Sequence, residues 1–411
     1  MGKPKIRFKG YEKEWEQRKL GELVKFSKGT GYSKGDLKES GTPIILYGRL
    51  YTKYEIVIKD VDTFVDAKIG SVYSCGGEVI VPASGETAED ISVASVVEKS
   101  GILLGGDLNI ITPSSELDST FLALSISNGK PHNDMAKMAQ GKSIVHLHNS
   151  DLEKIELAYP SYEEQVQIST YFGYLDHLIT LHQRKCEEIK ILKKYMLQKM
   201  FPRKGKNKPE IRFQGFTDAW EQRKLGEIAQ SFEYGLNAAA KEYDGTNKYL
   251  RITDIDDASR KFNTDNLTSP DIEFSTAENF RLFDGDILFA RTGASVGKSF
   301  IYRDSDGIVY FAGFLIRARI KMEYDAEFVF QNTLCESYGK YIQITSQRSG
   351  QPGVNAKEYS DYVFYLPTYD EQKKIGNFLH QIDNLITLHQ RKCDELKKVK
   401  KFMLQKMFPQ D

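Results

Sequence analysis

The stretch RTGASVGKSF, residues 291–300, is the part of the sequence that most resembles a site for chemistry. Glycines beside a Lys-Ser pair are typical of loops whose backbone amides wrap the phosphates of a nucleotide. Such a loop needs four residues between its first glycine and the Gly-Lys pair, whereas only three separate Gly293 from Gly297. The spacing argues against nucleotide binding, and an NTP-dependent enzyme is kept only as an alternative.

Two His/Cys pairs raise the question of a metal site. His182 and Cys186, and again His389 and Cys393, are spaced i, i+4, so each pair lies on one face of a helix. Packing of the two helices could bring all four side chains together as a Cys2His2 zinc set. The pairs lack the short Cys-to-Cys spacing of zinc fingers, and polar residues in a helix seam more often fix coiled-coil register. We therefore predict no metal and no other cofactor.

Motifs for catalysis are absent elsewhere in the sequence. There is no Pro-Pro pair, which excludes the Asp/Asn-Pro-Pro-Tyr/Phe site of adenine methyltransferases. A His-Glu-x-x-His helix, the zinc-binding motif of metalloproteases, does not occur either. We predict a non-catalytic protein.

Bulk composition limits the class of protein. A chain of 411 residues exceeds what one hydrophobic core usually supports, so we expect at least two domains. No run of about 18 apolar residues and no signal peptide is present. The four scattered cysteines agree with a reducing compartment, so we expect a cytoplasmic protein that does not enter membranes. Lys plus Arg equals Asp plus Glu, so local patches rather than net charge must indicate the partners.

The chain is an internal duplication. LITLHQRKC occurs at 178–186 and again at 385–393, within blocks 164–202 and 371–409 in which 24 of 39 positions are identical. Upstream, IRFKGYEKEWEQRKLGEL at 6–23 returns as IRFQGFTDAWEQRKLGEI at 211–228, with 12 of 18 identical. Each copy therefore runs from a tryptophan-bearing entry block, through a long middle region, to a Leu-Ile-Thr-Leu-His block.

The downstream blocks have the period of coiled-coil helices. Apolar residues recur at alternating steps of four and three over four to five heptads, with Lys193 and Lys400 as the breaks. Prolines at 160, 202, 367 and 409 bound the two blocks. About 39 helical residues at 1.5 Å each make a rod of roughly 58 Å. We expect the two helices to pack antiparallel about a pseudo-two-fold, with the middle regions at opposite ends.

The middle regions read as mixed α/β. Short segments rich in β-branched and aromatic residues, such as GEVIVPAS and GDILFARTG, are bounded by Gly, Pro or Asp. The predicted fold class is α+β, with two mixed α/β domains joined by two long antiparallel coiled-coil helices in a pseudo-two-fold repeat. The predicted organisation is a first domain at 1–160, a long helix at 161–202, a basic linker at 203–210, a second domain at 211–367 and a second long helix at 368–411.

The order of these parts resembles the specificity subunit of type I restriction-modification systems. The resemblance rests on the FxGFxxxWEQRKLGE entry block at 213–227 and on the helices ending in MLQKMFP. GETAEDI at 85–91, GDILFARTGASVGK at 285–298 and LPTYDEQKKI at 366–375 are also similar to that family's motifs. It covers essentially the whole chain.

The resemblance implies a function for each part. The two α/β domains would be target-recognition domains, each reading half of an asymmetric bipartite sequence in double-stranded DNA. The helices would dock two methyltransferase subunits, and the assembly would recruit restriction and translocase subunits. The retained helices and diverged middle regions agree with this implication, because identical docking surfaces would then carry two different readers. A coiled-coil scaffold for proteins alone is the second alternative.

Candidate DNA contacts come from loops that mix basic, amide and aromatic side chains. In the first domain the stretches 47–55 and 141–151 and the strand end at Ser84 offer Tyr47, Arg49, Lys53, Ser84, Lys142, Ser143, His146 and His148. In the second domain the stretches 291–300 and 347–358 and the strand at 248–255 offer Arg251, Arg291, Thr292, Lys298, Arg348, Gln351 and Asn355. Half-buried strands and solvated turns are the structural alternatives at these positions.

Candidate partner contacts come from the duplicated blocks. We expect the entry blocks to contribute Trp15, Arg18, Trp220 and Arg223, and the helices to contribute Leu178, His182, Leu385 and His389. These residues recur in equivalent positions because two copies of one partner would be bound in the same way.

Overall fold

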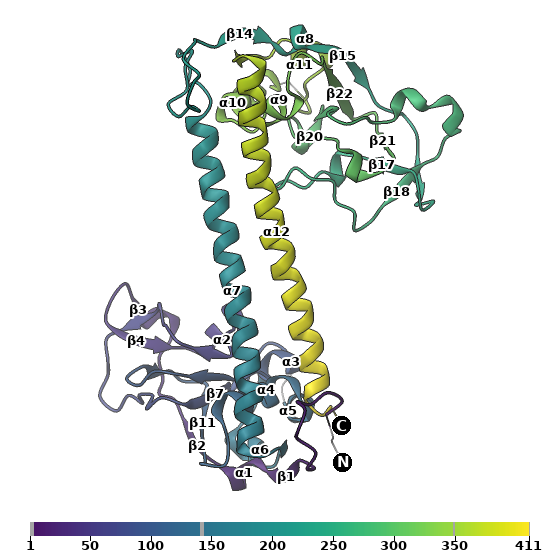
Figure 1. Cartoon of the computed structure of the whole chain (residues 1–411). Helices are drawn as coiled ribbons and strands as arrows, with labels where there is room; N and C mark the ends of the chain where they lie inside the picture. The colour runs from purple at the N-terminus through teal and green to yellow at the C-terminus, as the bar shows by residue number, and fades with distance from the viewer. Residues whose placement is uncertain (1–3, 140–143, 348–349, 411) are drawn as a thin grey trace. The chain divides into compact units, whose positions relative to one another are not determined.

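The computed structural model describes residues 4–139, 144–347 and 350–410. The chain forms two compact units, Met1–Gln183 with Arg391–Asp411 and Arg184–Gln390. Each unit therefore contains one α/β domain and one half of each long helix, α7 (Tyr162–Lys199) and α12 (Tyr369–Met407) (Figure 1). No helix in the described ranges is long and apolar enough to cross a membrane.

The first domain has a sheet in the order β2-β11-β7-β9-β5 and a smaller one in the order β10-β4-β6-β3. Its strands are β1 (Glu16–Lys19), β2 (Val24–Lys28), β3 (Leu37–Lys38), β4 (Thr42–Ile45), β5 (Val57–Ile58), β6 (Phe64–Val65), β7 (Glu78–Pro82), β8 (Ser84–Gly85), β9 (Ser95–Val97), β10 (Leu103–Leu104), β11 (Leu108–Pro113), β12 (Val145–His146) and β13 (Glu156–Tyr159). Its helices are α1 (Leu20–Leu23), α2 (Arg49–Thr52), α3 (Ala88–Ile91), α4 (Ser119–Asn128), α5 (Lys130–Met138) and α6 (Asn149–Leu152).

The second domain repeats this plan with a sheet in the order β15-β22-β19-β20. Its strands are β14 (Glu221–Lys224), β15 (Ala229–Tyr234), β16 (Ala240–Glu242), β17 (Lys248–Leu250), β18 (Thr268–Pro270), β19 (Ile287–Ala290), β20 (Ser299–Ile301), β21 (Val309–Phe311), β22 (Leu315–Ile320) and β23 (Val363–Leu366). Its helices are α8 (Leu225–Ile228), α9 (Ala326–Asn332), α10 (Glu336–Thr345) and α11 (Ala356–Ser360), with a 3-10 turn at Gly293–Ser295. Parallel pairs β4–β10 and β17–β21 occupy matching places, so topology was kept where sequence diverged.

The central strands form because their residues are apolar on both faces. All residues of β7 and β19 are buried, and helices α4 and α9 belong to the same hydrophobic clusters as these strands. Each of those helices begins at an aspartate cap: Asp118 accepts from the Phe121 amide at 2.8 Å and Asp325 from the Phe328 amide at 2.7 Å. The first residue of each entry block forms a backbone hydrogen bond to the end of a long helix: Ile6 N donates to Lys406 O, and Ile211 N donates to Lys199 O.

The two long helices pack antiparallel within each unit. In the first unit Phe172 meets Phe408 at 6.0 Å between ring centroids, while Asp176 pairs with Lys400 at 2.5 Å. In the second unit the Cys186 thiol donates to Ile386 O at 3.9 Å, and Lys193 pairs with Asp383 at 2.6 Å. Residue numbers rise along one helix as they fall along the other, which confirms the predicted antiparallel fold. The two lysines that break the heptads are thus each neutralised by an aspartate of the other helix.

Candidate nucleic-acid interfaces

In the second domain, strand β19 delivers Arg291 to a surface turn. The turn is held by a segment some 60 residues later: Val354 N donates to Arg291 O at 2.9 Å and Gly293 N donates to Pro352 O at 3.0 Å. Thr292 forms an antiparallel bridge with Gly353. The fold therefore brings Arg291 and Thr292 beside Gln351 and Asn355, which the sequence alone could only place on separate loops.

Gly293 allows this close approach. Its φ is 70°, a left-handed conformation that side-chain-bearing residues rarely adopt. A Cβ added there would lie 3.0 Å from Gln351 Nε2. The glycine that resembles part of a phosphate-binding loop thus has a packing role in joining two surface segments.

Arg291 has a guanidinium that the domain itself does not neutralise. It lies 5.1 Å from the Tyr234 ring centroid and 5.7 Å from that of Phe314, an arrangement typical of cation–π stacking. Across the described ranges no carboxylate lies within ion-pair distance of Arg291, and its buried Nε has no hydrogen-bond partner. Arg317 and Arg319 of the same domain are neutralised, since both pair with Asp286. The planar fork of Arg291 is therefore positioned but unused, as recognition of a base edge or phosphate requires.

Tyr234 and Phe314 are site residues that the sequence reasoning missed. Both rings are about half exposed, at 43% and 55%. The Ala356 amide donates to the Tyr234 hydroxyl at 3.2 Å, which ties β15 to the same surface. An aromatic residue next to glycine at a strand end, as in Tyr234-Gly235 and Gly313-Phe314, was the available signal.

Arg251 and Lys298 are engaged within the second domain. Arg251 holds Asp254 through two hydrogen bonds of 2.9 Å. Lys298 is 7% exposed, donates to Ile255 O at 3.0 Å and pairs with Asp257 at 2.6 Å. A DNA contact by either side chain would require these interactions to open, and the same engagement of Lys298 disfavours a nucleotide-binding loop.

Asn355 caps α11, since its Oδ1 accepts from the Glu358 amide at 2.9 Å. Gln351 is exposed beside Gly293. Arg348 lies outside the described residues. The second site is thus an exposed surface of Tyr234, Arg291, Thr292, Phe314, Gln351 and Asn355.

The first domain builds the same arrangement with different side chains. Leu147 N donates to Ala83 O at 3.0 Å, as Val354 N does to Arg291 O, and β8 pairs with β12 so that Ser84 faces His146. The Ser84 hydroxyl and His146 Nδ1 are 3.1 Å apart. Ala83 stands where the second domain has Arg291, and Ser84 is only 8% exposed, so this site offers the exposed imidazole of His146 in place of a guanidinium.

Helix α2 borders the Ser84 turn. The Tyr51 hydroxyl donates to Ser84 O at 2.5 Å, and its ring meets that of the exposed Tyr47 at 6.0 Å. Burial raises the pKa of Tyr51 above the usual range, so it remains a neutral donor. Tyr47 and Ser84, which lie on separate stretches of the sequence, are thus brought close together through Tyr51.

Two basic residues of this region are also engaged. The Arg49 side chain is 8% exposed and pairs with Glu55 at 2.8 Å and Asp62 at 2.7 Å. Lys53 is exposed and shares Asp62 at 2.8 Å. Arg49 therefore stabilises the loop that presents Tyr47, whereas Lys53 can exchange its surface pair for a phosphate at small cost.

Of the remaining candidates of the first domain, His148 lies at the start of α6. His148 caps this helix, and its amide donates to Asp151 at 3.2 Å. Lys142 and Ser143 lie outside the described residues.

The predicted partner residues divide into core and surface. The Trp15 ring packs on Phe121 at 5.7 Å, and Trp220, 3% exposed, packs on Phe328 at 5.6 Å. Both tryptophans thus anchor the entry blocks inside the domains. Arg18 and Arg223 are at the surface, where Arg18 pairs with Glu22 and Glu116, and Arg223 pairs with Glu221.

The long helices carry an apolar stripe outside the buried seam. Leu178 and Leu385 are 39% and 46% exposed, and His182 and His389 are half-buried. The stripe consists of Leu178, Leu181, Val399 and Phe402 in the first unit, and of Leu385, Leu388, Leu192 and Tyr195 in the second. These are equivalent positions of the repeat. Charged residues also lie between them along the helices, some of them in pairs such as Lys185–Glu188 and Lys392–Glu395. Exposed large apolar side chains are typical of a protein-binding surface.

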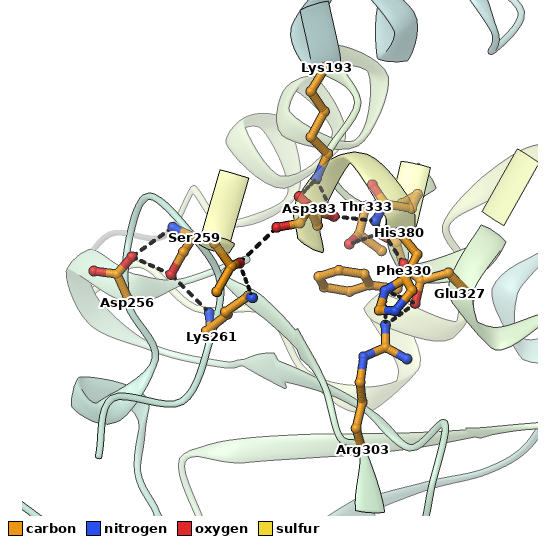
Figure 2. Close-up of polar contacts among 12 residues, drawn as sticks. Lys193, Asp256, Ser259, Lys261, Arg303, Glu327, Phe330, Thr333, His380 and Asp383 are labelled. Atoms are coloured by element: carbon orange, nitrogen blue, oxygen red, sulfur yellow. Dashed lines mark hydrogen bonds and ion pairs between the residues drawn. The ribbon is translucent and has the colours of Figure 1, made fainter. Parts of the chain in front are cut away.

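Polar contacts tie the second domain to its helices. Asp383 accepts from both Lys193 and Gln331, and Gln331 also donates to Glu327 at 2.8 Å (Figure 2). Arg303 pairs with Glu327 and lies 3.1 Å from His380 Nδ1. In the first unit Gly173 and Leu124 occupy the positions equivalent to His380 and Gln331, so this network is specific to the second unit.

The structure shows no metal centre in its described part, since no group of three or more His, Cys, Asp or Glu side chains there is arranged to hold an ion. Cys186 instead lies within 3.8 Å of Gln390 Oε1. This arrangement agrees with a seam position for the cysteine.

Comparison with known proteins gives one consistent family. The family model described as type I restriction modification DNA specificity domain matches residues 12–191 and 217–398. A type I restriction enzyme MjaVIII specificity subunit from Methanocaldococcus jannaschii is 24% identical over 401 residues, covering 94% of this chain and 90% of that protein. A putative type I restriction enzyme MjaX specificity subunit from the same organism is 27% identical over 195 residues, 46% of this chain and 45% of that protein.

Solved structures show the same fold. The S subunit of a type I restriction-modification system from M. genitalium superposes with a TM-score of 0.63 at 15% identity, covering 99% of both chains. A chain from a structure of complex assembly and conformational transition in the type I R-M system gives 0.51 at 14% identity, over 97% of this chain and 98% of that one.

Proposed function

Because this chain belongs to the type I restriction-modification DNA specificity family, we propose that it reads an asymmetric bipartite target in double-stranded DNA through its two α/β domains. The observation that carries the proposal is the repeated strand end bound by a crossing segment. The second domain presents Arg291 there, whereas the first presents Ala83, Ser84 and His146. One scaffold with two side-chain sets suits two half-sites of different sequence.

Within the second site, Arg291 is the proposed base reader. A guanidinium fork can meet guanine O6 and N7 together, and stacking between Tyr234 and Phe314 limits its rotamers before DNA arrives. Gln351 and Asn355 beside it carry amides suited to adenine. In the first site, the proposed contacts are Tyr47, Lys53, Ser84 and His146.

The chain itself is proposed to carry no catalytic step and no cofactor. Methyl transfer and DNA cleavage would be supplied by two methyltransferase subunits and by restriction and translocase subunits. The apolar stripe supports docking of two equivalent partners, because exposed apolar side chains recur at equivalent positions once in each unit.

The test is to map methylated adenines in a host that carries this chain with its partner subunits. We expect one bipartite, asymmetric motif. Replacing residues 24–159 with the corresponding part of another family member should change one half of that motif and leave the other half intact. Loss of both halves in a complex that still assembles would contradict two independent readers.

A further inference from the structure

The helix pair of the first unit has two open faces that differ in charge. Lys397 and Val399 are two residues apart, which places them about 200° around the helix from each other. Val399 belongs to the apolar stripe. Lys397 belongs to the other face, together with Lys400 and Lys401. A second partner with different chemistry therefore fits this second face.

The lysines line a groove of about 450 Å³, which we call the basic groove. Its walls come from α12, from Asp176 and Ile179 of α7, and from Asn128 at the end of α4. Asp176 pairs with Lys400 at 2.5 Å. Within the described part of the chain, Lys397 and Lys401 have no ion pair and both are exposed. Two positive charges are thus left uncompensated in a concave surface.

The basic groove adjoins the proposed DNA surface of the first domain. Asn128 follows Ser127, whose hydroxyl accepts from the Tyr54 hydroxyl at 3.1 Å. Tyr54 in turn follows the candidate DNA contact Lys53, which is the C-cap residue of α2.

The second unit carries the same lysines in a more neutral form. Lys190, Lys193 and Lys194 are the equivalents of Lys397, Lys400 and Lys401. Lys190 pairs with Glu187 at 2.7 Å and Lys193 with Asp383 at 2.6 Å. Uncompensated charge is therefore greater in the first unit, which limits the inference to that unit.

We propose that the basic groove binds the phosphate backbone of double-stranded DNA next to the half-site read by the first domain. This inference rests on the proposed function and extends it to the helices. Lysine ammonium groups bind phosphates as point charges without reading sequence, so the groove would position DNA and would not select it.

The test uses the full chain assembled with its methyltransferase subunits and compares Lys397→Gln, Lys401→Gln and the double variant with the parent. Binding is measured at several salt concentrations on the target duplex and on a duplex whose first half-site is scrambled. Each substitution should reduce the slope of log K against log salt by about 0.9, and the double by about 1.8. Both duplexes should weaken by the same factor. Lys398→Gln is the matched control, because Lys398 is exposed on the same helix but does not line the groove.

An unchanged slope in the double variant would overturn the proposal. So would a change in preference between the two duplexes, because a backbone contact cannot discriminate them. The parent could also bind inorganic phosphate and the double variant not, with DNA affinity the same in both. That result would assign the groove to a small anion and overturn the proposal. Failure of the proposed function gives a different result from failure of the groove proposal. If the chain read no DNA target, the parent would show no preference for any duplex, whereas the salt slope could still be measured.

Discussion

Replacing Arg291 with alanine tests the proposed reader of the second half-site. The substitution removes the guanidinium but keeps the backbone contacts, since Val354 N donates to the Arg291 carbonyl oxygen. No carboxylate in the described ranges is left unpaired by it. The fold therefore loses only the stacking on Tyr234 and Phe314, worth about 0.5–1 kcal/mol for each exposed cation–π contact.

DNA recognition should lose more. A bidentate contact to guanine discriminates against other bases by about 1–3 kcal/mol, which corresponds to about 5- to 150-fold in the ratio of dissociation constants. We expect this loss at one base pair of the second half-site, with the first half-site read as before.

The assay is equilibrium binding of the assembled methyltransferase to the target and to duplexes substituted one base pair at a time. Arg291→Lys is the matched control: it keeps the charge but lacks the planar fork, so it should lose the base preference and retain the salt slope. Equal affinity of parent and Arg291→Ala for every duplex would refute the assignment. Uniform weakening on all duplexes would instead make Arg291 a phosphate contact.

Three further predictions concern other parts of the structure. Asp383→Ala leaves Lys193, which is 13% exposed, and Gln331 without their shared carboxylate, and should lower the free energy of unfolding measured in urea by about 2–3 kcal/mol. Asp176→Ala removes a carboxylate that is 40% exposed and should lower it less. Equal losses would contradict the network in Figure 2. Leu178→Glu and Leu385→Glu, on the apolar stripe, should leave the melting temperature within a few degrees while each removes one methyltransferase subunit from the complex measured by native mass spectrometry; retention of both subunits would exclude the stripe as the docking surface. Lys298→Ala should lower the free energy of unfolding by about 1–3 kcal/mol through lost contacts with Ile255 and Asp257. An unchanged stability with a smaller salt slope would instead support the DNA contact that the sequence predicted for Lys298.

The sequence alone determined the large-scale architecture. Duplication is a matter of residue identity, and a heptad seam is a matter of spacing along one helix, so neither depends on contacts between distant segments. The same holds for the ends of α7 and α12, which lie within a few residues of the prolines that bound the two blocks. Glycine at 293 was visible too, but the left-handed backbone that favours it, with a φ of 70°, was not, because tertiary contacts set it.

Only the tertiary structure decided which charged residues are available to a ligand. Arg49, Lys298 and Arg291 look alike in sequence, each basic and near a turn. Arg49 and Lys298 are neutralised by carboxylates that loops bring to them, whereas Arg291 meets two aromatic rings from other strands. Whether a charge is free depends on the sum of its neighbours in space, at distances of a few ångströms where Coulomb energies are large. Neighbours of this kind come from segments far apart in the chain, and a pattern along the chain does not contain them.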